Sequence, residues 1–190
     1  MAATAAGLLV SSPAIAAPFT GPTIFLAADY NLLDVDGSHK GFGTGEDSKA
    51  RVVVNGGYDV KVIGRLTAGV ELAGTIGDQR VCVALPGRSY CVDTKTEFSA
   101  LSRVGYVLRP NILIFGEVGY ATSRGRLTYT DMVAPRHNSL RDGDLSGLQL
   151  GSGVELALSK HSYARLNYRY TDFWMGLKEN QLVGGVGLRF

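Results

Sequence analysis

The sequence lacks the features that would place it in several common classes of protein. No stretch of its 190 residues approaches the roughly 20 apolar residues of a transmembrane helix. The formal net charge is only +2, so there is no basic surplus of the kind that nucleic-acid-binding proteins carry. No segment shows apolar residues at helical spacing. These absences exclude a helical membrane protein, argue against a nucleic-acid partner and favour a β-rich protein.

What the chain does contain is a repeated alternation of apolar and polar residues, which is typical of a β-strand with two different faces. In one such segment Leu66, Ala68 and Val70 share a face, and Thr67 and Glu71 lie on the other. Apolar alternation of this kind recurs eight times along the chain, near residues 24–32, 51–59, 65–72, 97–106, 112–120, 148–156, 164–171 and 181–190. We therefore expect eight antiparallel strands.

The connections between these segments alternate in length. Three are short, at 60–62, 108–111 and 159–162, whereas four are longer and polar, at 34–49, 75–95, 122–145 and 172–179. Short turns at one end and long loops at the other predict an eight-stranded antiparallel up-and-down β-barrel. A soluble barrel would place the apolar set inside, and a transmembrane barrel would place it outside. The periodicity alone does not decide between the two.

Charged residues in the middle of the strands favour the transmembrane barrel. They share a face with many glycines, and small residues in a narrow barrel leave room for long charged side chains. The expected interior charge network comprises Arg51, Arg65, Glu71, Arg103, Glu117, Glu155, Arg165 and Arg169. Aromatic residues near the strand ends favour the same arrangement, because they would form the interfacial girdles of a transmembrane barrel. They are Tyr58, Tyr106, Tyr163 and Phe190 at one rim and Tyr30, Tyr120, Phe173 and Trp174 at the other.

Counting outward from each short turn predicts opposite-charge pairs across the hairpins. Glu155 faces Arg165, five residues on either side of Lys160. The same count pairs Glu117 with Arg103 and, for a turn centred near Lys61, Arg51 with Glu71. Residues directly across an antiparallel pair come close enough to bond. We expect these pairs, with Arg65 and Arg169 nearby, to form a polar plug that closes the lumen.

The first residues differ in character from the rest. A short apolar stretch (residues 5–10) is followed by Ser-Ser-Pro and then by Ala14-Ile15-Ala16, which matches the small-x-small pattern of a signal-peptidase site. We expect residues 1–16 to be a signal peptide and residues 17–190 to be the barrel. The segment has no Lys or Arg, so either the signal peptide is truncated at its N-terminus or these residues are an ordinary chain terminus.

Cys82 and Cys91 lie close together in the second long loop, "VCVALPGRSYC". In an exported protein this spacing predicts a disulfide. A metal site is not expected, because no third ligand lies nearby in the sequence. His137-Asn138-Ser139 in the third long loop could supply the nucleophile and base of an acyl hydrolase, but a solvated polar loop is the favoured interpretation. The glycines of "GFGTGE" (41–46) do not join a strand to a helix and predict no nucleotide site. No cofactor is expected.

Two longer segments resemble a known family. "LQLGSGVELALSKHSYARLNYRYTDF" (148–173) with the final "VGLRF" and, less strongly, "SRVGYVLRPNILIFGEVGYA" (102–121) are similar to the porin-family, OmpA-like outer-membrane β-barrels of the opacity-protein superfamily. The resemblance implies a location in the bacterial outer membrane and contact with outer-membrane lipid. It also implies insertion by the barrel assembly machinery, which would recognise the closing strand through Phe190, Leu188 and Val186.

The resemblance implies no particular activity, because function in such families lies in the loops. The favoured role is a structural, surface-exposed protein that supports envelope integrity and contacts an unknown extracellular ligand or surface through its long loops. A small-solute porin is the alternative. A lipid-directed acyl hydrolase of the outer leaflet is the third hypothesis.

Overall fold

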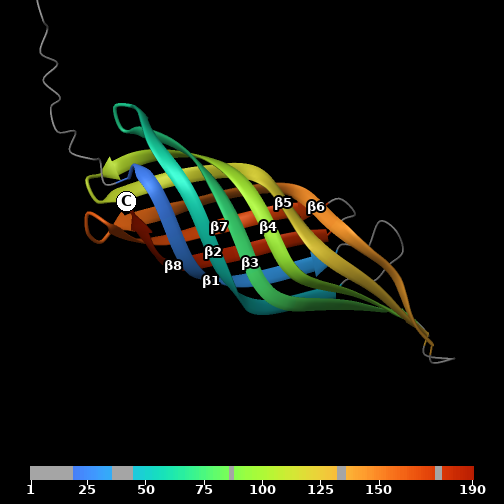
Figure 1. The fold of residues 1–190 in the computed structure, drawn as a ribbon. Coiled ribbons are helices and arrows are strands. Elements are labelled where there is room, and N and C mark those ends of the chain that lie inside the picture. Colours follow the sequence, from blue (N-terminus) through green and yellow to red (C-terminus); the bar gives the residue numbers. More distant parts are fainter. Residues whose placement is uncertain (1–18, 36–44, 86–87, 132–135, 174–176) are drawn as a thin grey trace, which may run out of the picture.

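The computed structural model describes residues 19–35, 45–85, 88–131, 136–173 and 177–190. They form a closed antiparallel barrel in which each strand pairs with its neighbours in sequence and the last strand pairs with the first (Figure 1). The strands are β1 (Gly21–Val35), β2 (Gly45–Ile63), β3 (Leu66–Leu85), β4 (Arg88–Arg109), β5 (Ile112–Asp131), β6 (Arg136–Ala157), β7 (Ser162–Phe173) and β8 (Leu177–Arg189). The predicted eight-stranded up-and-down barrel is confirmed. No helix among these residues is long and apolar enough to cross a membrane.

Two of the predicted loops are wrong, because they consist mostly of strand. β3 and β4 stay paired as far as Leu85 and Arg88, and β5 and β6 stay paired as far as Asp131 and Arg136. Shifts in register between Ile76 and Gln79, and again between Leu127 and Thr128, break the period of two at these points. A bulge of this kind hides a continuing strand from a count of alternating residues.

The first short turn also lies further along the chain than predicted. β2 continues through residues 60–62 and ends at Ile63, so that the turn consists of Gly64 and Arg65. Gly64 has a φ of 55°, which a glycine adopts more readily than other residues. The register of β2 against β3 follows from this turn.

The predicted inside-out arrangement is confirmed by the exposure of neighbouring residues. On β3, Leu72 is 68% exposed while Glu71 is 2% exposed. The same contrast runs around the barrel, with exposed Leu26, Val104 and Leu150 on the outer face. The apolar side chains thus form the outer surface, as a lipid environment requires.

The predicted aromatic girdles are correct only in part. Tyr58, Tyr106 and Phe190 at one rim, and Tyr30 and Tyr120 at the other, are exposed on the outer face. Tyr163 and Phe173 are instead buried at 1% and 2% exposure. Tyr163 stacks on Phe25 with ring centroids 5.9 Å apart, and Phe173 packs with Ala121 and Leu177. Both residues have the parity of Arg165 and Arg169 on the inward face, so the errors come from assigning the girdles by position near the strand ends alone. Trp174 lies outside the described residues.

The separation of the two faces predicts how substitutions will behave. Leu166→Arg places a charge on the outer face in the middle of β7 and is expected to destabilise the barrel by about 2–4 kcal/mol. Asn167→Ser, one residue along, removes one interior hydrogen bond to Glu117 and is expected to cost about 1 kcal/mol. Urea unfolding of the barrel refolded into lipid vesicles measures both.

Leu158→Arg is the matched control for Leu166→Arg. Leu158 is also exposed, at 57% against 50% for Leu166, but it follows the end of β6 in a short turn. Charged substitutions near the membrane interface cost only about 0–1 kcal/mol. Equal losses at residues 158 and 166 would contradict the placement of the apolar belt.

Candidate functional site

The interior of the barrel contains an extensive network of charged side chains. Its members come from all eight strands, and each is at most 7% exposed: Asp29, Arg51, Asp59, Glu71, Glu97, Arg103, Glu117, Glu155, Arg165, Arg169, Glu179 and Arg189. A buried charge is costly unless it is paired and hydrogen-bonded. The network is therefore expected to be organised by opposite-charge contacts, and the distances show that it is.

Glu71 is one centre of the network in the half of the barrel nearer the short turns. One of its carboxylate oxygens lies 2.5 Å from Arg165 Nη1, and the other lies 2.7 Å from Arg169 Nη2. Asn55 donates a further hydrogen bond to Glu71 at 2.8 Å, and Arg103 is 3.8 Å away. Four strands, β2, β3, β4 and β7, thus meet at one carboxylate.

Glu155 is the second centre. It accepts hydrogen bonds from Arg189 at 2.7 Å, Arg103 at 3.2 Å and Arg165 at 3.4 Å. Asp59 completes this part of the network, 3.5 Å from Arg103 and 3.3 Å from Arg189. Arg103 and Arg165 each contact both Glu71 and Glu155, so they link the two centres.

Aromatic rings pack against the same arginines. The Arg103 guanidinium carbon lies 4.3 Å from the centre of the Phe115 ring, and that of Arg165 lies 4.7 Å from the Phe25 ring. Tyr163 is 5.0 Å from the Arg189 guanidinium. Attraction between a cation and an aromatic face is strongest where water is excluded. These rings fill the space between the charges and stabilise the arginines.

A smaller cluster lies in the half of the barrel nearer the long hairpins. Arg51 is 2.8 Å from Asp29, 2.6 Å from Glu179 and 3.7 Å from Glu97. Gln181 donates to both Glu179 and Glu97, at 3.0 Å and 3.3 Å. The lumen is therefore occupied by charged and amide side chains along most of its length.

Glycines on the neighbouring strands make room for this network. Gly151 lies directly across from Glu117, and a Cβ atom at residue 151 would come within 2.6 Å of the Glu117 carboxylate. A Cβ atom at Gly69 would overlap the carboxylate of Asp59, its partner on β2. An eight-stranded barrel encloses only enough space for its own side chains, so a glycine beside a long charged residue provides room that a larger residue would take.

The structure places one predicted pair as expected. Glu155 and Arg165 lie directly across from one another on β6 and β7 and make the 3.4 Å contact described above. Arg103 and Glu117 are also partners in register, but Arg103 reaches across the lumen, and Glu117 instead accepts a hydrogen bond from Arg169 at 2.7 Å. Long side chains in a narrow barrel reach beyond the neighbouring strand.

Two sequence predictions about the network are wrong. Arg51 does not face Glu71: with the turn at Gly64 and Arg65, Glu71 pairs in register with Gly57. Arg65 is not an interior residue either. It lies in that turn with an exposed side chain, and its backbone carbonyl accepts a hydrogen bond from Val107 at 2.8 Å. Both errors follow from placing the turn three or four residues too early.

Five interior charges were not predicted as members of the network: Asp29, Asp59, Glu97, Glu179 and Arg189. Four of them share the polar face of a predicted strand, so the alternation already contained the signal. Glu179 was assigned to a loop because β8 starts at Leu177, earlier than the apolar pattern indicates.

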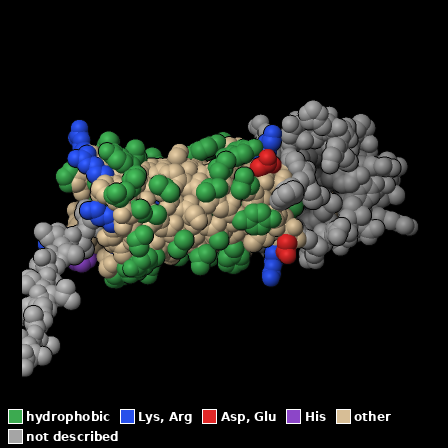
Figure 2. Space-filling model, turned by 90° about the horizontal axis from the view of Figure 1, so that it is seen from above, with side chains coloured by type: hydrophobic (Ala, Val, Ile, Leu, Met, Phe, Trp, Pro, Cys, Tyr) green, Lys and Arg blue, Asp and Glu red, His purple; other side chains and the backbone are tan. Residues whose placement is uncertain are grey.

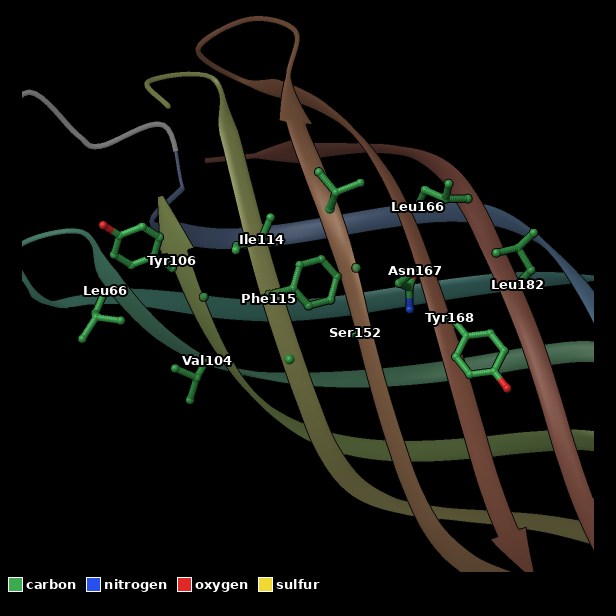
Figure 3. Close-up of a pocket in the computed structure, with 14 residues that line it drawn as sticks. Leu66, Val104, Tyr106, Ile114, Phe115, Ser152, Leu166, Asn167, Tyr168 and Leu182 are labelled. Atoms are coloured by element: carbon green, nitrogen blue, oxygen red, sulfur yellow. The ribbon is translucent and has the colours of Figure 1, made fainter. Parts of the chain in front are cut away.

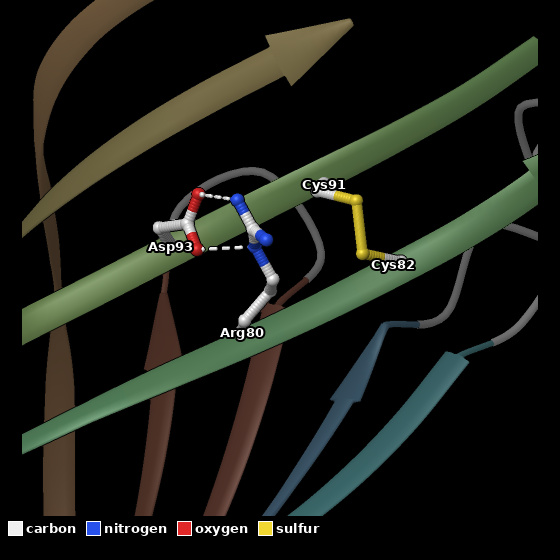
Figure 4. Close-up of a disulfide and its surroundings, with 4 residues drawn as sticks. All are labelled: Arg80, Cys82, Cys91 and Asp93. Atoms are coloured by element: carbon white, nitrogen blue, oxygen red, sulfur yellow. Dashed lines mark hydrogen bonds and ion pairs between the residues drawn. A yellow bond between two sulfur atoms is a disulfide. The ribbon is translucent and has the colours of Figure 1, made fainter. Parts of the chain in front are cut away.

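The predicted disulfide is present in the β3–β4 hairpin, beyond the end of the closed barrel. Cys82 and Cys91 are directly opposite one another on β3 and β4 and are joined covalently (Figure 4). Two residues away, Arg80 Nε lies 2.6 Å from Asp93, and this hydrogen bond raises the pKa of the exposed Arg80 guanidinium. The disulfide and the ion pair connect the two strands of the hairpin where they extend beyond the barrel.

The His137-Asn138-Ser139 triplet was predicted to lie in a loop, but it lies in β6 near the start of that strand. His137 pairs with Thr130 and Ser139 with Thr128 on β5. The triplet therefore lies close to the tip of a hairpin and far along β6 from Glu155. Within the described part of the chain, no group of three or more His, Cys, Asp or Glu side chains could hold a metal ion.

A closed barrel with an apolar outer surface and a charged interior defines the class of integral outer-membrane proteins. The chain matches the family model of the outer membrane protein beta-barrel domain over residues 2–190, and it belongs to that family. The comparison with curated proteins gives no match. The short turns accordingly face the periplasm, and the long hairpins face the cell exterior.

Solved structures share the fold at low sequence identity. Ail, the attachment invasion locus protein of Yersinia pestis, has a TM-score of 0.61 and 13% identity, and the match covers 90% of this chain and 99% of Ail. OprG of Pseudomonas aeruginosa has a TM-score of 0.59 and 14% identity over 90% and 96% of the two chains. Neisserial surface protein A has a TM-score of 0.54 and 15% identity over 90% and 98%.

The contacts of Glu71 predict a large effect of a nearly isosteric substitution. Glu71→Gln leaves Arg165 without its closest carboxylate and Arg169 with Glu117 alone, and it is expected to destabilise the barrel by about 3–5 kcal/mol. Asp93→Asn, which breaks the exposed ion pair with Arg80, is expected to cost about 0–1 kcal/mol. Urea unfolding of the refolded proteins compares the two.

A double-mutant cycle tests whether Glu71 and Arg165 act through one another. Combining Glu71→Gln with Arg165→Met removes both charges and is expected to cost less than the sum of the single losses. Strictly additive losses would show that the 2.5 Å contact contributes nothing to stability.

Proposed function

We propose that this protein is a structural outer-membrane barrel with a closed lumen, which supports the cell envelope and displays its long hairpins at the cell surface. The buried charge network is the observation that supports a closed lumen. Eight charges in the periplasmic half balance one another, since Arg103, Arg165, Arg169 and Arg189 face Asp59, Glu71, Glu117 and Glu155. A neutral, hydrogen-bonded and aromatic-packed plug has little tendency to admit water or ions.

Conductance separates this role from the alternative, a small-solute porin. The refolded barrel in a planar lipid bilayer is expected to carry no current above that of added detergent alone. Raising the salt concentration is not expected to open it, because buried ion pairs are screened far less than exposed ones. Stable single-channel currents from the wild-type chain would favour the porin.

The hairpins support the surface role. β3 and β4 remain paired from Gln79 and Thr94 to Leu85 and Arg88, beyond the last pairing of β3 with β2 at Ile76. β5 and β6 extend in the same direction (Figure 1). A disulfide lowers the conformational freedom of the unfolded hairpin and so favours its ordered form. A stapled hairpin that projects from the membrane is suited to contact a ligand outside the cell.

A sulfated saccharide is the first ligand to test. Ail, which shares the fold, is in complex with the heparin analogue sucrose octasulfate. The hairpins of this chain carry several arginines, namely Arg80, Arg88, Arg124, Arg126, Arg136 and Arg141. Guanidinium groups suit bidentate recognition of anionic oxygens.

We expect the refolded protein to bind immobilised heparin, and a chain in which a two-residue turn joins Ile76 to Thr96 to bind it at least about tenfold more weakly. The shortened chain should still migrate as a folded barrel before boiling. Failure of the wild-type protein to bind heparin would reject the sulfated ligand, and undiminished binding by the shortened chain would reject the β3–β4 hairpin as its site.

The proposal includes no catalytic activity. His137 and Ser139 lie near a hairpin tip, away from the apolar belt that contacts lipid. An acyl hydrolase of the outer leaflet would need its nucleophile and base at the lipid surface. Loss of an outer-membrane lipid deacylation on Ser139→Ala would overturn this part of the proposal.

Assembly in the membrane is proposed to depend on the outer face of β8. Val186, Leu188 and Phe190 are 59%, 52% and 67% exposed on that face. The Phe190 amide donates to the Pro22 carbonyl at 3.0 Å, next to the seam between β8 and β1. These residues form the signal that the assembly machinery would recognise, and the outer-membrane yield of Phe190→Ala tests it.

The signal peptide at residues 1–16 likewise stays a proposal, because those residues lie outside the described part.

A further inference from the structure

The outer face of the barrel is hollowed in the middle of the β4–β7 region. A groove of about 600 Å³ lies over β4, β5, β6 and β7 and is lined mainly by apolar side chains (Figure 3). Val104 and Tyr106 form one side, and Leu166, Tyr168 and Leu182 form the other. Because these residues belong to the exposed apolar belt, the groove opens toward the membrane.

Two small residues create the groove. Gly116 and Ser152 are directly opposite one another on β5 and β6, in a row where Val104 and Tyr168 are the next partners on either side. A Cβ atom at Gly116 would meet only the Gly151 carbonyl, at 3.9 Å. At the centre of this row the surface consists of backbone and the small Ser152 side chain, whereas Val104 and Tyr168 on either side are large.

The groove lies in the periplasmic half of the belt. Leu66 lines it and directly follows the turn at Gly64 and Arg65. Tyr106 is three residues before Arg109, at the end of β4. The hydrocarbon that meets this part of the surface belongs to the periplasmic leaflet of the outer membrane, which is built from phospholipids.

The rim beside the groove is basic. The short-turn segments 61–65, 109–111 and 158–161 contain Lys61, Arg65, Arg109 and Lys160 and no Asp or Glu. In Figure 2, Lys and Arg side chains lie at both ends of the barrel, whereas the Asp and Glu side chains in view lie only at the end away from the short turns. Arg65 and Arg109 are exposed, and neither forms an ion pair with another described residue. The backbone bond between Arg65 and Val107 brings the first turn against β4.

We propose that this groove and rim form a binding site for an anionic phospholipid of the periplasmic leaflet. One acyl chain lies in the groove over Gly116 and Ser152, and Arg65 and Arg109 bind the phosphate of the headgroup. Guanidinium groups match the geometry of phosphate oxygens. The site uses a residue that the lumen does not, since Arg65 is excluded from the interior network.

The shape and charge of the site favour a lipid over a second copy of the chain. Two barrels meet along convex surfaces, and a convex surface does not fill a groove in its partner. A flexible hydrocarbon chain can follow the groove, and its headgroup complements the basic rim. An identical barrel would instead bring the positive rim of its own short turns into the same region when it inserts in the same orientation.

Native mass spectrometry of the refolded barrel in detergent, titrated with phosphatidylglycerol, tests the site. Gly116→Leu fills the groove with a side chain suited to the lipid face. Gly56→Leu is its matched control, because a Cβ atom at Gly56 would meet only the Thr23 carbonyl, at 4.0 Å, on the outer face of β2. Arg65→Gln with Arg109→Gln removes the proposed phosphate ligands, and Lys61→Gln with Lys160→Gln removes the same charge from the same rim.

We expect the wild-type barrel and both controls to bind one phosphatidylglycerol with dissociation constants within about twofold of each other. Gly116→Leu and the double arginine variant should each raise the dissociation constant by about tenfold or more. All variants should keep the compact migration of the folded barrel, which excludes misfolding as the cause.

Three outcomes would overturn the proposal. Equal affinity in all variants would show that lipid binds without using the groove. Sensitivity to the arginines but not to Gly116→Leu would indicate a phosphate contact without an acyl-chain site. A dimer that Gly116→Leu dissociates, in place of a lipid adduct, would assign the groove to a second copy of the chain.

Discussion

The neutralisation of charges inside a narrow, lipid-surrounded cylinder is the constraint on which the rest of the structure depends. Glu71 and Glu155 each bind several arginines, and Arg103 and Arg165 connect them. Because the surrounding solvent is hydrocarbon, an arginine that loses its partner cannot turn outward to water. The position of each charge thus fixes which strand must stand opposite and which of its residues must be small, as at Gly69 and Gly151.

The same constraint explains the relation between the two faces. A strand that carries Glu71 inward must carry Val70 and Leu72 outward, since the backbone allows no other arrangement. The outer face therefore follows from the inner one, except where a glycine or serine interrupts it. Gly116 and Ser152 are two such interruptions on neighbouring strands, and together they leave a groove in the lipid surface.

Most of the fold could be predicted from the sequence because alternation reports directly on a two-sided strand. Eight strands, their order and the outward position of residues such as Leu72 and Leu150 followed from that pattern. The pattern failed where the period of two is interrupted, as between Ile76 and Gln79, and it placed the first turn before Gly64. The network was harder to predict. The Glu155–Arg165 contact joins neighbouring strands, whereas the Arg165–Glu71 contact crosses the lumen. A count along the chain carries no information on distances across a barrel.

The contribution of Arg189 to the network has a consequence for the order of events during folding. Arg189 lies in the last strand, yet it binds Glu155 on β6 and Asp59 on β2. Arg189 can reach Glu155 across β7 in an open sheet, but Asp59 gains Arg189 only when β8 pairs with β1. Before that pairing the sheet presents an incompletely neutralised interior to its surroundings. Closure of the seam therefore joins two events in one step, the completion of backbone pairing and the pairing of the buried charges in the periplasmic half of the lumen. Because unpaired charge is costly in hydrocarbon, we expect insertion in the membrane and closure of the cylinder to be coupled.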